Sequence, residues 1–147
     1  MQRLSTRKIG NEGENIACEF LVQNGYEIIA RNWRTRTGEI DIIAQKCDII
    51  VFVEVKAIAH CTFDMIEGKI NQKKQERILK TSKRFLLNHR EYNNKFVRFD
   101  VIFVDMLGLC GENSIVPEET WEVLAQVFSV ILTDEDYGEK IDKKNWK

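Results

Sequence analysis

An unbroken run of five apolar residues at positions 49–53, Ile-Ile-Val-Phe-Val, limits the possible folds more than any other feature. A run this short and this rich in β-branched side chains is typical of a strand covered on both faces. Helices are the expected cover, because residues 9–24 and 71–89 carry apolar side chains at helical spacing and Gly25 marks the end of the first. The chain is therefore expected to form a sheet between helical layers.

The other expected elements complete an alternating pattern. Strands are expected at residues 26–31, 38–45, 49–56 and 97–104. A last helix is expected to open at Pro117. The order α-β-β-β-α-β-α predicts an α/β sandwich around a mixed sheet. A chain of 147 residues suits one domain, expected over residues 1–132, with a charged C-terminal tail at 133–147.

Composition argues against a membrane or secreted protein. No apolar run approaches the roughly 20 residues that span a bilayer. The charged start of the chain is not followed by an apolar block, so we expect no secretory signal and a cytoplasmic location. The four cysteines lie far apart without a C-x-x-C pair and are expected to be reduced thiols.

The net charge of −1 conceals a strongly basic middle segment. Residues 69–98 hold 10 basic and 2 acidic residues, whereas residues 99–147 hold 4 basic and 11 acidic residues. Cations gathered on one surface would bind a polyanion such as nucleic acid. The alternative is a solvated helix face, which is what most charge runs are.

Two carboxylates and one ammonium are expected to meet on neighbouring strands. If residues 47–48 form a two-residue loop, the numbers of paired residues sum to 95, so that Asp41 faces Glu54. A four-residue loop centred on the same point keeps this pairing. Lys56 shares their face, with Glu39 expected opposite it. The other face would carry apolar side chains, namely Ile40, Ile42, Val51, Val53 and Val55.

A divalent cation would relieve the repulsion between two carboxylates placed this close. Mg²⁺ or Mn²⁺ binds carboxylate and carbonyl oxygens, and Mg²⁺ keeps several waters and then accepts phosphate oxygens. Lys56 beside the metal would help to orient or deprotonate a water and would stabilise charge on a phosphate. The set therefore suits hydrolysis of a phosphodiester. The alternative is a structural ion pair between Lys56 and Glu54 or Glu39.

Glu14 is a fourth candidate for this site. It lies on the helix row of Gly10, Glu14, Ala17 and Leu21, at the border of the apolar face. An acid in this position could reach the metal or hold a metal-bound water. The alternative is a glutamate that is favoured in the first turn by the helix dipole.

These residues belong to a set of motifs spread over about residues 8–104. The motifs are Gly10-x-x-Gly13-Glu14-x-x-Ala17, Gly25-Tyr26, Arg31-Asn32-Trp33-Arg34, Gly38-Glu-Ile-Asp-Ile-Ile43, Val51-Phe-Val-Glu-Val-Lys56, Lys73-Lys-Gln75 and Arg98-Phe-Asp-Val-Ile102. In combination they resemble the YraN-like family of bacterial proteins. That family is similar to archaeal-type Holliday-junction resolvases and to the PD-(D/E)XK restriction-endonuclease-like proteins. The resemblance implies a three-layer sandwich with a central mixed sheet flanked by helices.

The resemblance also implies roles for individual residues. Asp41, Glu54 and Lys56 occupy the D…E-x-K positions of the superfamily. The backbone carbonyl of Val55 corresponds to a further metal ligand, and Glu14 matches the helix-borne acid of the resolvases. These positions imply that the metal is held by Asp41, Glu54 and Val55, with Glu14 as an additional ligand.

The expected function is that of an endonuclease that uses Mg²⁺ or Mn²⁺ to cut DNA, with branched DNA as the substrate that the resolvases suggest. Phosphate contacts are expected from the basic block, namely Lys69, Lys73, Lys74, Arg77, Lys80, Lys83 and Arg84, with Gln75 as an additional polar group near the site. A homodimer is implied only by analogy with junction cleavage.

Two further hypotheses stand beside the endonuclease. At positions 57–58 this chain has Ala-Ile, where family members have Thr-Arg, so an expected phosphate contact is missing. That departure and the acidic C-terminal part favour a nucleic-acid-binding module of the same fold with weak or no turnover. The third hypothesis is a structural protein that binds neither metal nor DNA.

Overall fold

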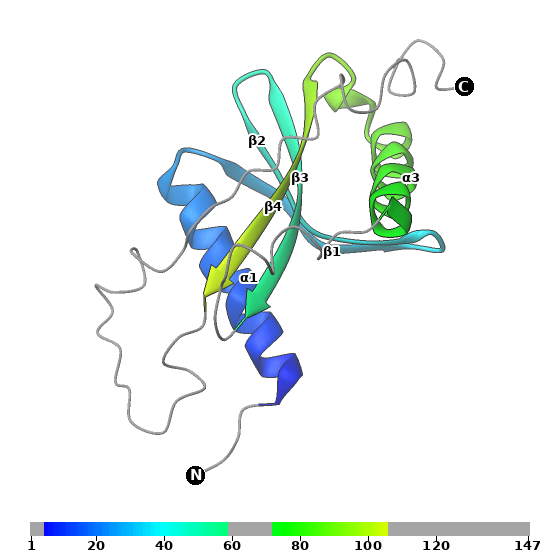
Figure 1. The fold of residues 1–147 in the computed structure, drawn as a ribbon. Coiled ribbons are helices and arrows are strands. Elements are labelled where there is room, and N and C mark those ends of the chain that lie inside the picture. The colour runs from blue at the N-terminus through cyan, green and yellow to red at the C-terminus, as the bar shows by residue number, and fades with distance from the viewer. Residues whose placement is uncertain (1–4, 59–71, 106–147) are drawn as a thin grey trace.

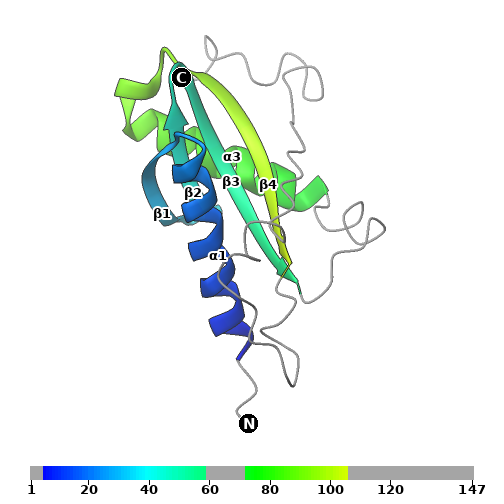
Figure 2. The ribbon, with the colours of Figure 1, turned by 90° about the vertical axis from the view of Figure 1, so that its left-hand side faces the viewer.

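The computed structural model describes residues 5–58 and 72–105, which form a mixed four-stranded sheet with one helix on each face (Figures 1 and 2). The elements are α1 (Thr6–Gln23), β1 (Glu27–Thr35), β2 (Gly38–Lys46), β3 (Ile49–Ile58), α3 (Gln72–Asn88), the 3₁₀ helix η1 (Arg90–Tyr92) and β4 (Phe96–Asp105). The predicted α/β class is confirmed, and the layers are compatible with a restriction-endonuclease-like sandwich. The helix expected at Pro117 and the tail at 133–147 lie outside the described residues.

The strand order is β1-β2-β3-β4, with the first two pairs antiparallel and β3–β4 parallel. Parallel neighbours need a crossover, and α3 lies in that connection. Within β3, Ile50, Val51, Phe52 and Val53 are each at most 1% exposed. The prediction of a strand covered on both faces is therefore confirmed. Within the described ranges, no helix is long and apolar enough to cross a membrane.

The first helix ends as the sequence predicts. Gly25 has a φ of 82°, its N–H donates to the Val22 carbonyl, and the N–H of Tyr26 donates to the Leu21 carbonyl. These two bonds satisfy the last carbonyls of the helix, and the positive φ is one that glycine adopts without strain. The chain then enters β1 directly.

Each face of the sheet packs against one helix. The core on the α1 side consists of Ala17, Leu21, Ile42, Ala44, Val51, Val53, Ile102 and Val104. The core on the α3 side consists of Ile40, Ile43, Ile50, Phe52, Ile78, Phe85, Leu86 and Phe99. Over residues 50–57 of β3, odd-numbered side chains therefore face α1 and even-numbered ones face α3, as the pleat of a strand requires.

The turn between β2 and β3 sets the register that the sequence predicts. Residues 47–48 form a two-residue loop, and the pairs run from Lys46↔Ile49 to Ile42↔Val53. Cys47 has a φ of 51°, in the positive range that the tight turns of hairpins use. Every observed pair sums to 95, so the register is confirmed over this stretch.

The β1–β2 ribbon changes face beyond Ile42. Ile42 packs on the α1 side, whereas Ile40, two residues away, packs on the α3 side. In β1, Trp33 also lies on the α3 side, opposite Ile40, and Asn32 has a φ of 50°. The prediction that Ile40 and Ile42 share a face is wrong, because the ribbon turns over at this point. It then runs beneath α3, as Figure 1 shows.

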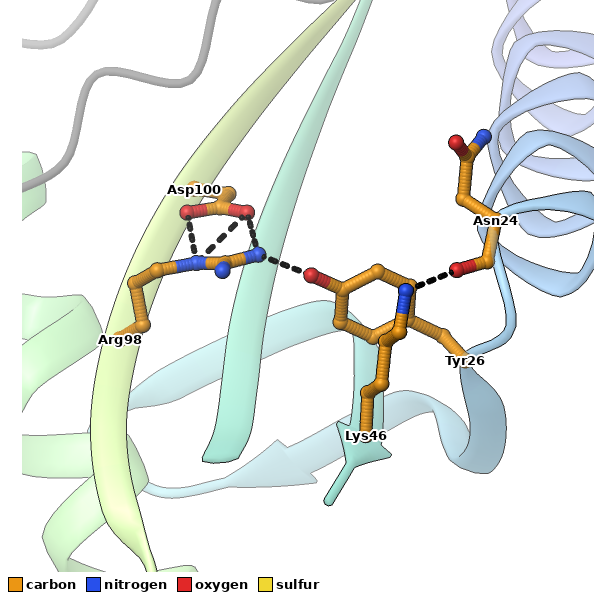
Figure 3. Close-up of polar contacts among 5 residues, drawn as sticks. All are labelled: Asn24, Tyr26, Lys46, Arg98 and Asp100. Atoms are coloured by element: carbon orange, nitrogen blue, oxygen red, sulfur yellow. Dashed lines mark hydrogen bonds and ion pairs between the residues drawn. The ribbon is translucent and has the colours of Figure 1, made fainter. Parts of the chain in front are cut away.

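A polar cluster joins the edge strand β4 to the end of α1 (Figure 3). The guanidinium of Arg98 donates to both carboxylate oxygens of Asp100 at 2.7–3.2 Å, and its Nη2 also donates to the Tyr26 hydroxyl at 2.8 Å. Lys46 lies over the Tyr26 ring at 5.3 Å and donates to the Asn24 carbonyl. Asp100 is 5% exposed, so its charge depends on Arg98 for compensation.

Removal of the buried carboxylate should therefore destabilise the fold. We expect Asp100→Ala to lower the free energy of unfolding by about 3 kcal/mol, because Arg98 is left half-buried without its counter-charge. The double variant Arg98→Met, Asp100→Leu should be more stable than the single variant, since it removes both charges. Urea denaturation measures both values. A loss below about 1 kcal/mol for Asp100→Ala would contradict this account of the cluster.

Helix α1 approaches β3 closely at Gly13. A Cβ atom at Gly13 would lie 2.6 Å from the Cβ of Ala57, closer than real Cβ atoms approach. Gly13 is buried, and the contact fixes the height of α1 above the sheet. Ala57 thus faces α1, so the first of the two positions that depart from the family pattern does not point towards the α3 side.

Two alanine substitutions in α1 should have opposite effects. We expect Gly13→Ala to destabilise the protein by about 1–2 kcal/mol, because the clash with Ala57 outweighs the better helix propensity. Gly10→Ala is the matched control, since no atom lies within 4 Å of its added Cβ, and it should stabilise the helix by about 0.5–1 kcal/mol. Thermal denaturation of the two variants compares them, and equal stabilities would refute the close contact.

Candidate functional site

The candidate site begins where β2 separates from β3. An Oδ2 atom of Asp41 accepts the N–H of Val55 at 2.8 Å. In a continued antiparallel ladder that N–H would donate to the carbonyl of Ile40. The carboxylate of Asp41 takes the place of that carbonyl, so the strands part after the pair Ile42↔Val53. The carbonyl of Val55 points to this same edge of β3, because the N–H and C=O of one strand residue share a direction.

Glu54 lies next to this opening, on the α3 side of β3. It is 6% exposed, and its Oε1 is 3.2 Å from Nζ of Lys56 and 2.9 Å from Nζ of Lys74. Burial lowers the pKa of Lys74. The hydrogen bond to Glu54 and the negative charge of Glu54 raise this pKa by a larger amount, so it lies above its usual value. Lys74, expected as a phosphate contact, is thus an ion-pair partner within the site.

The environment of Asp41 favours its protonated form. Burial and the nearby Glu54 carboxylate raise the pKa of Asp41 from 3.8 to about 7, although the N–H of Val55 opposes the shift. Glu14 also raises it. Asp41 and Glu54 are therefore close enough to repel each other, as the register predicts, and a shift of this kind is common in functional sites.

Glu14 approaches from α1 and is held in place by β1. Its carboxylate accepts a hydrogen bond from Asn32 at 2.9 Å and lies 3.8 Å from the guanidinium of Arg31, which also donates to Asn15. The side chain is only 15% exposed, which agrees with its place at the border of the apolar face. The partners of Glu14 could not be predicted, because they depend on the local conformation at Asn32.

One predicted pairing is wrong. Glu39, expected opposite Lys56, instead forms an ion pair with Arg34 of β1 at 2.7 Å, and its side chain is 42% exposed. The reason is the separation of β2 from β3, which ends the ladder before it reaches Glu39. A structural bridge between Lys56 and Glu39 is therefore excluded, whereas the bridge from Lys56 to Glu54 is present.

The donor set fits a hard divalent cation with an incomplete protein shell. Among the described residues, no three His, Cys, Asp or Glu side chains lie close enough to hold a metal ion together. Asp41, Glu54 and the Val55 carbonyl offer oxygen atoms, which Mg²⁺ and Mn²⁺ prefer. Mg²⁺ commonly binds through one or two carboxylates and keeps several waters. The residues therefore suit a site in which water and substrate complete the coordination.

Three further predicted residues of the basic block lie on α3. Lys73 and Arg77 are exposed on α3, one turn apart, and Gln75 is half-buried. Lys69 lies outside the described residues. Sequence reasoning missed the role of Asn32 and Arg31 in holding Glu14. Their signal was the Arg-Asn-Trp-Arg motif, which contains no acid or nucleophile and so pointed to no chemistry by itself.

Comparison with known proteins agrees with the motifs. The model of the family described as "Uncharacterised protein family UPF0102" matches residues 13–104. Similar relatives are UPF0102 proteins of Treponema denticola, 48% identical over 64% of this chain and 78% of the relative, and of Treponema pallidum, 50% identical over 64% and 75%. A third, from Caldicellulosiruptor bescii, is 40% identical over 76% of this chain and 92% of the relative. The chain therefore belongs to the UPF0102 family, also known as YraN.

Proposed function

We propose that this protein is a metal-dependent phosphodiester hydrolase that acts on DNA. The observation that carries the proposal is the pair of buried carboxylates, Asp41 and Glu54, at the opening between β2 and β3, with Lys56 beside them. Two buried acids that repel each other and raise a pKa to about 7 are a costly arrangement for a purely structural site. A bound cation would compensate that repulsion.

Asp41, Glu54 and the carbonyl of Val55 are the groups that would hold Mg²⁺ or Mn²⁺. When bound, such an ion supplies Lewis-acid polarisation of a phosphate oxygen and makes a water more acidic. Glu14, held by Asn32 beside the same opening, adds negative charge to the site without being a required ligand. The ion would replace the ammonium groups as the principal counter-charge of Glu54.

Lys56 has the geometry of a group that stabilises charge. Its Nζ atom is 3.2 Å from Glu54, and its side chain is about 30% exposed, so the ammonium borders solvent. In hydrolysis a water oxygen forms a new P–O bond, the bond to the leaving oxygen breaks, and that oxygen takes up a proton. The ammonium of Lys56 would stabilise the negative charge that builds on the phosphate oxygens and orient the attacking water.

The DNA would contact α3 next to this site. Lys73 and Arg77 are exposed and share one side of the helix, since residues four apart are neighbours on a helix surface. Lys74, one residue from Lys73, reaches Glu54 directly. Cations that bind phosphates fix the position of the duplex without reading its sequence. Such contacts agree with cleavage selected by the shape of DNA, for example at a branch.

A second candidate function is a nucleic-acid-binding module without turnover. The observation that favours it is the double compensation of Glu54 by Lys56 and Lys74, which neutralises this carboxylate without any metal. In that case the carboxylates and lysines form a buried ionic network that shapes the surface, and α3 binds phosphates only. Binding with a steep salt dependence and no cleavage products would select this candidate.

The stability of the metal-free protein should depend on Asp41 in a defined direction. The folded pKa of about 7 lies above the ordinary 3.8, so the folded state holds the extra proton and stability falls as pH rises between these values. We expect Asp41→Asn to remove this fall and to be more stable than the wild type at pH 8 by on the order of 2 kcal/mol. Millimolar Mn²⁺ should raise the melting temperature of the wild type but not of the variant.

Asp48→Asn is the matched control for this experiment, because Asp48 lies exposed in the β2–β3 turn. It should keep both the pH dependence and the response to Mn²⁺. Denaturation in urea between pH 5 and pH 8.5 gives the stabilities, and thermal melting with added Mn²⁺ gives the response. Parallel pH profiles for wild type and Asp41→Asn would contradict the repulsion between the carboxylates.

Cleavage should depend on Glu54 and Lys56. With Mg²⁺ or Mn²⁺, we expect Glu54→Gln and Lys56→Ala to lower the cleavage rate by about a hundredfold or more, because each removes a group that acts on the reacting phosphate. Glu39 lies on the part of β2 that is no longer paired to β3, and its side chain forms an ion pair with Arg34. The Glu39→Gln variant should therefore cleave like the wild type. The assay uses supercoiled plasmid together with linear, flapped and four-way DNA.

The preparation must be free of contaminating nucleases, and circular dichroism must confirm that each variant is folded. Residual cleavage that is equal in wild type and Glu54→Gln would identify a contaminant. A wild-type protein that cleaves none of the four substrates with either metal would defeat the proposed hydrolysis in favour of the binding module.

A further inference from the structure

A cationic groove lies between the β1–β2 turn and α3, apart from the carboxylate pair. Its volume is about 710 Å³, and four basic side chains line it: Arg36 from the turn and Lys80, Lys83 and Arg84 from α3. Thr35, Thr37 and Leu87 are the other lining residues within the part of the chain that the structure describes, and none of the seven is acidic. These walls therefore give the groove a strongly positive character.

The two walls of the groove are fixed to each other. The hydroxyls of Thr37 and Thr81 are hydrogen-bonded at 3.1 Å, which fastens the turn to α3. Thr35 bonds both the hydroxyl and the N–H of Thr37, and a Cβ at Gly38 would lie 3.3 Å from the Thr81 hydroxyl. The groove is thus formed without a ligand, because these hydrogen bonds and the close approach of Gly38 to the Thr81 side chain define its shape.

The two elements that adjoin the groove, α3 and β2, also contribute residues to the candidate active site. Along α3, Lys74 contacts Glu54, and Lys80 and Arg84 follow at about 9 and 15 Å along the helix axis, at about 1.5 Å per residue. Along β2, the turn begins at Gly38, about 10 Å from Asp41. Both elements that adjoin the groove therefore also reach the carboxylate site, over about 9–15 Å along α3 and about 10 Å along β2.

A linear polyanion is the ligand that matches this arrangement. A DNA strand presents one phosphate about every 3.4 Å of duplex axis, so a strand in the groove would reach the carboxylates within a few nucleotides. A lone phosphate could use only part of four cations, and it would gain nothing from the continuation of the row to Arg77 and Lys73. An acidic peptide carries charges of the right sign but without this regular spacing.

We propose that this groove binds the phosphodiester backbone of DNA a few nucleotides from the phosphate that the carboxylate site cleaves. The proposal rests on the proposed function for the position of the cleaved bond, but the binding itself does not. Arg36 and the α3 cations contact successive phosphates on the two sides of one strand. The contacts are charge-assisted and independent of base sequence.

The test is binding of a fluorescein-labelled duplex of about 20 base pairs by fluorescence anisotropy in EDTA, where no divalent metal is present. We expect Lys80→Ala, Arg84→Ala to lower the affinity by about tenfold or more, and the slope of log affinity against log salt to fall by about 1.8. Arg36→Ala should lower the slope by about 0.9. The matched control is Arg7→Ala, Lys8→Ala, which removes one Arg and one Lys from the exposed start of α1.

An affinity and slope equal to those of the wild type in the groove variants would overturn the proposal. An equal loss in the α1 control would also overturn it, because net charge alone would then explain the binding. A poly-glutamate peptide that competes as well as unlabelled DNA would assign the groove to an acidic partner instead. If the wild type binds DNA through the groove but does not cleave it, the proposed hydrolysis is wrong and the groove proposal stands. If the wild type cleaves DNA but the groove variants bind it as tightly as the wild type, the groove proposal is wrong and the proposed hydrolysis stands.

Discussion

The hydrogen bond from the Val55 N–H to the carboxylate of Asp41 organises this molecule. A carboxylate that replaces a backbone carbonyl in a sheet ends the ladder without leaving the N–H unsatisfied. The bond thus lets β2 part from β3 in the interior of the protein. It also brings a negative charge to within reach of Glu54, and the repulsion between the two acids follows from that single contact.

Much of this site could be predicted from sequence, because the position of a tight turn determines which residues pair in an antiparallel ladder. Once residues 47–48 form a tight turn, the pairs from Lys46↔Ile49 to Ile42↔Val53 follow by counting. This register brings Asp41 close to Glu54, although the ladder ends before the two residues pair. The apolar run at 49–53 identifies the central strand. The layers follow from the period of the flanking helices. The parity of the strands also places Lys56 on the face of Glu54, where the structure has it.

The rest depends on a departure from regular pairing. Regular pairing predicted that the β2–β3 ladder extends to Glu39 and that Ile40 and Ile42 share a face. Both predictions are wrong, because the ribbon turns over beyond Ile42. The cause is local, namely the positive φ at Asn32 and the bond of Asp41 to a backbone N–H. Such features are set by tertiary contacts, and the hydrophobic periodicity of the sequence does not indicate them. Lys74 was likewise identified as a surface cation because a helix pattern gives no distance to the sheet.

The first residues of strand β2 run from the turn that is fastened to α3 through Thr37 and Thr81 to the carboxylate pair at Asp41. Only three peptide units separate Gly38 from Asp41, and this segment is paired to β1 but not to β3. Because this extended segment is short, a displacement of the turn would also displace Asp41. The position of Asp41 would then depend on what binds at the turn. Binding energy from a distant part of a long polymer would thereby help to position Asp41 against the reacting bond.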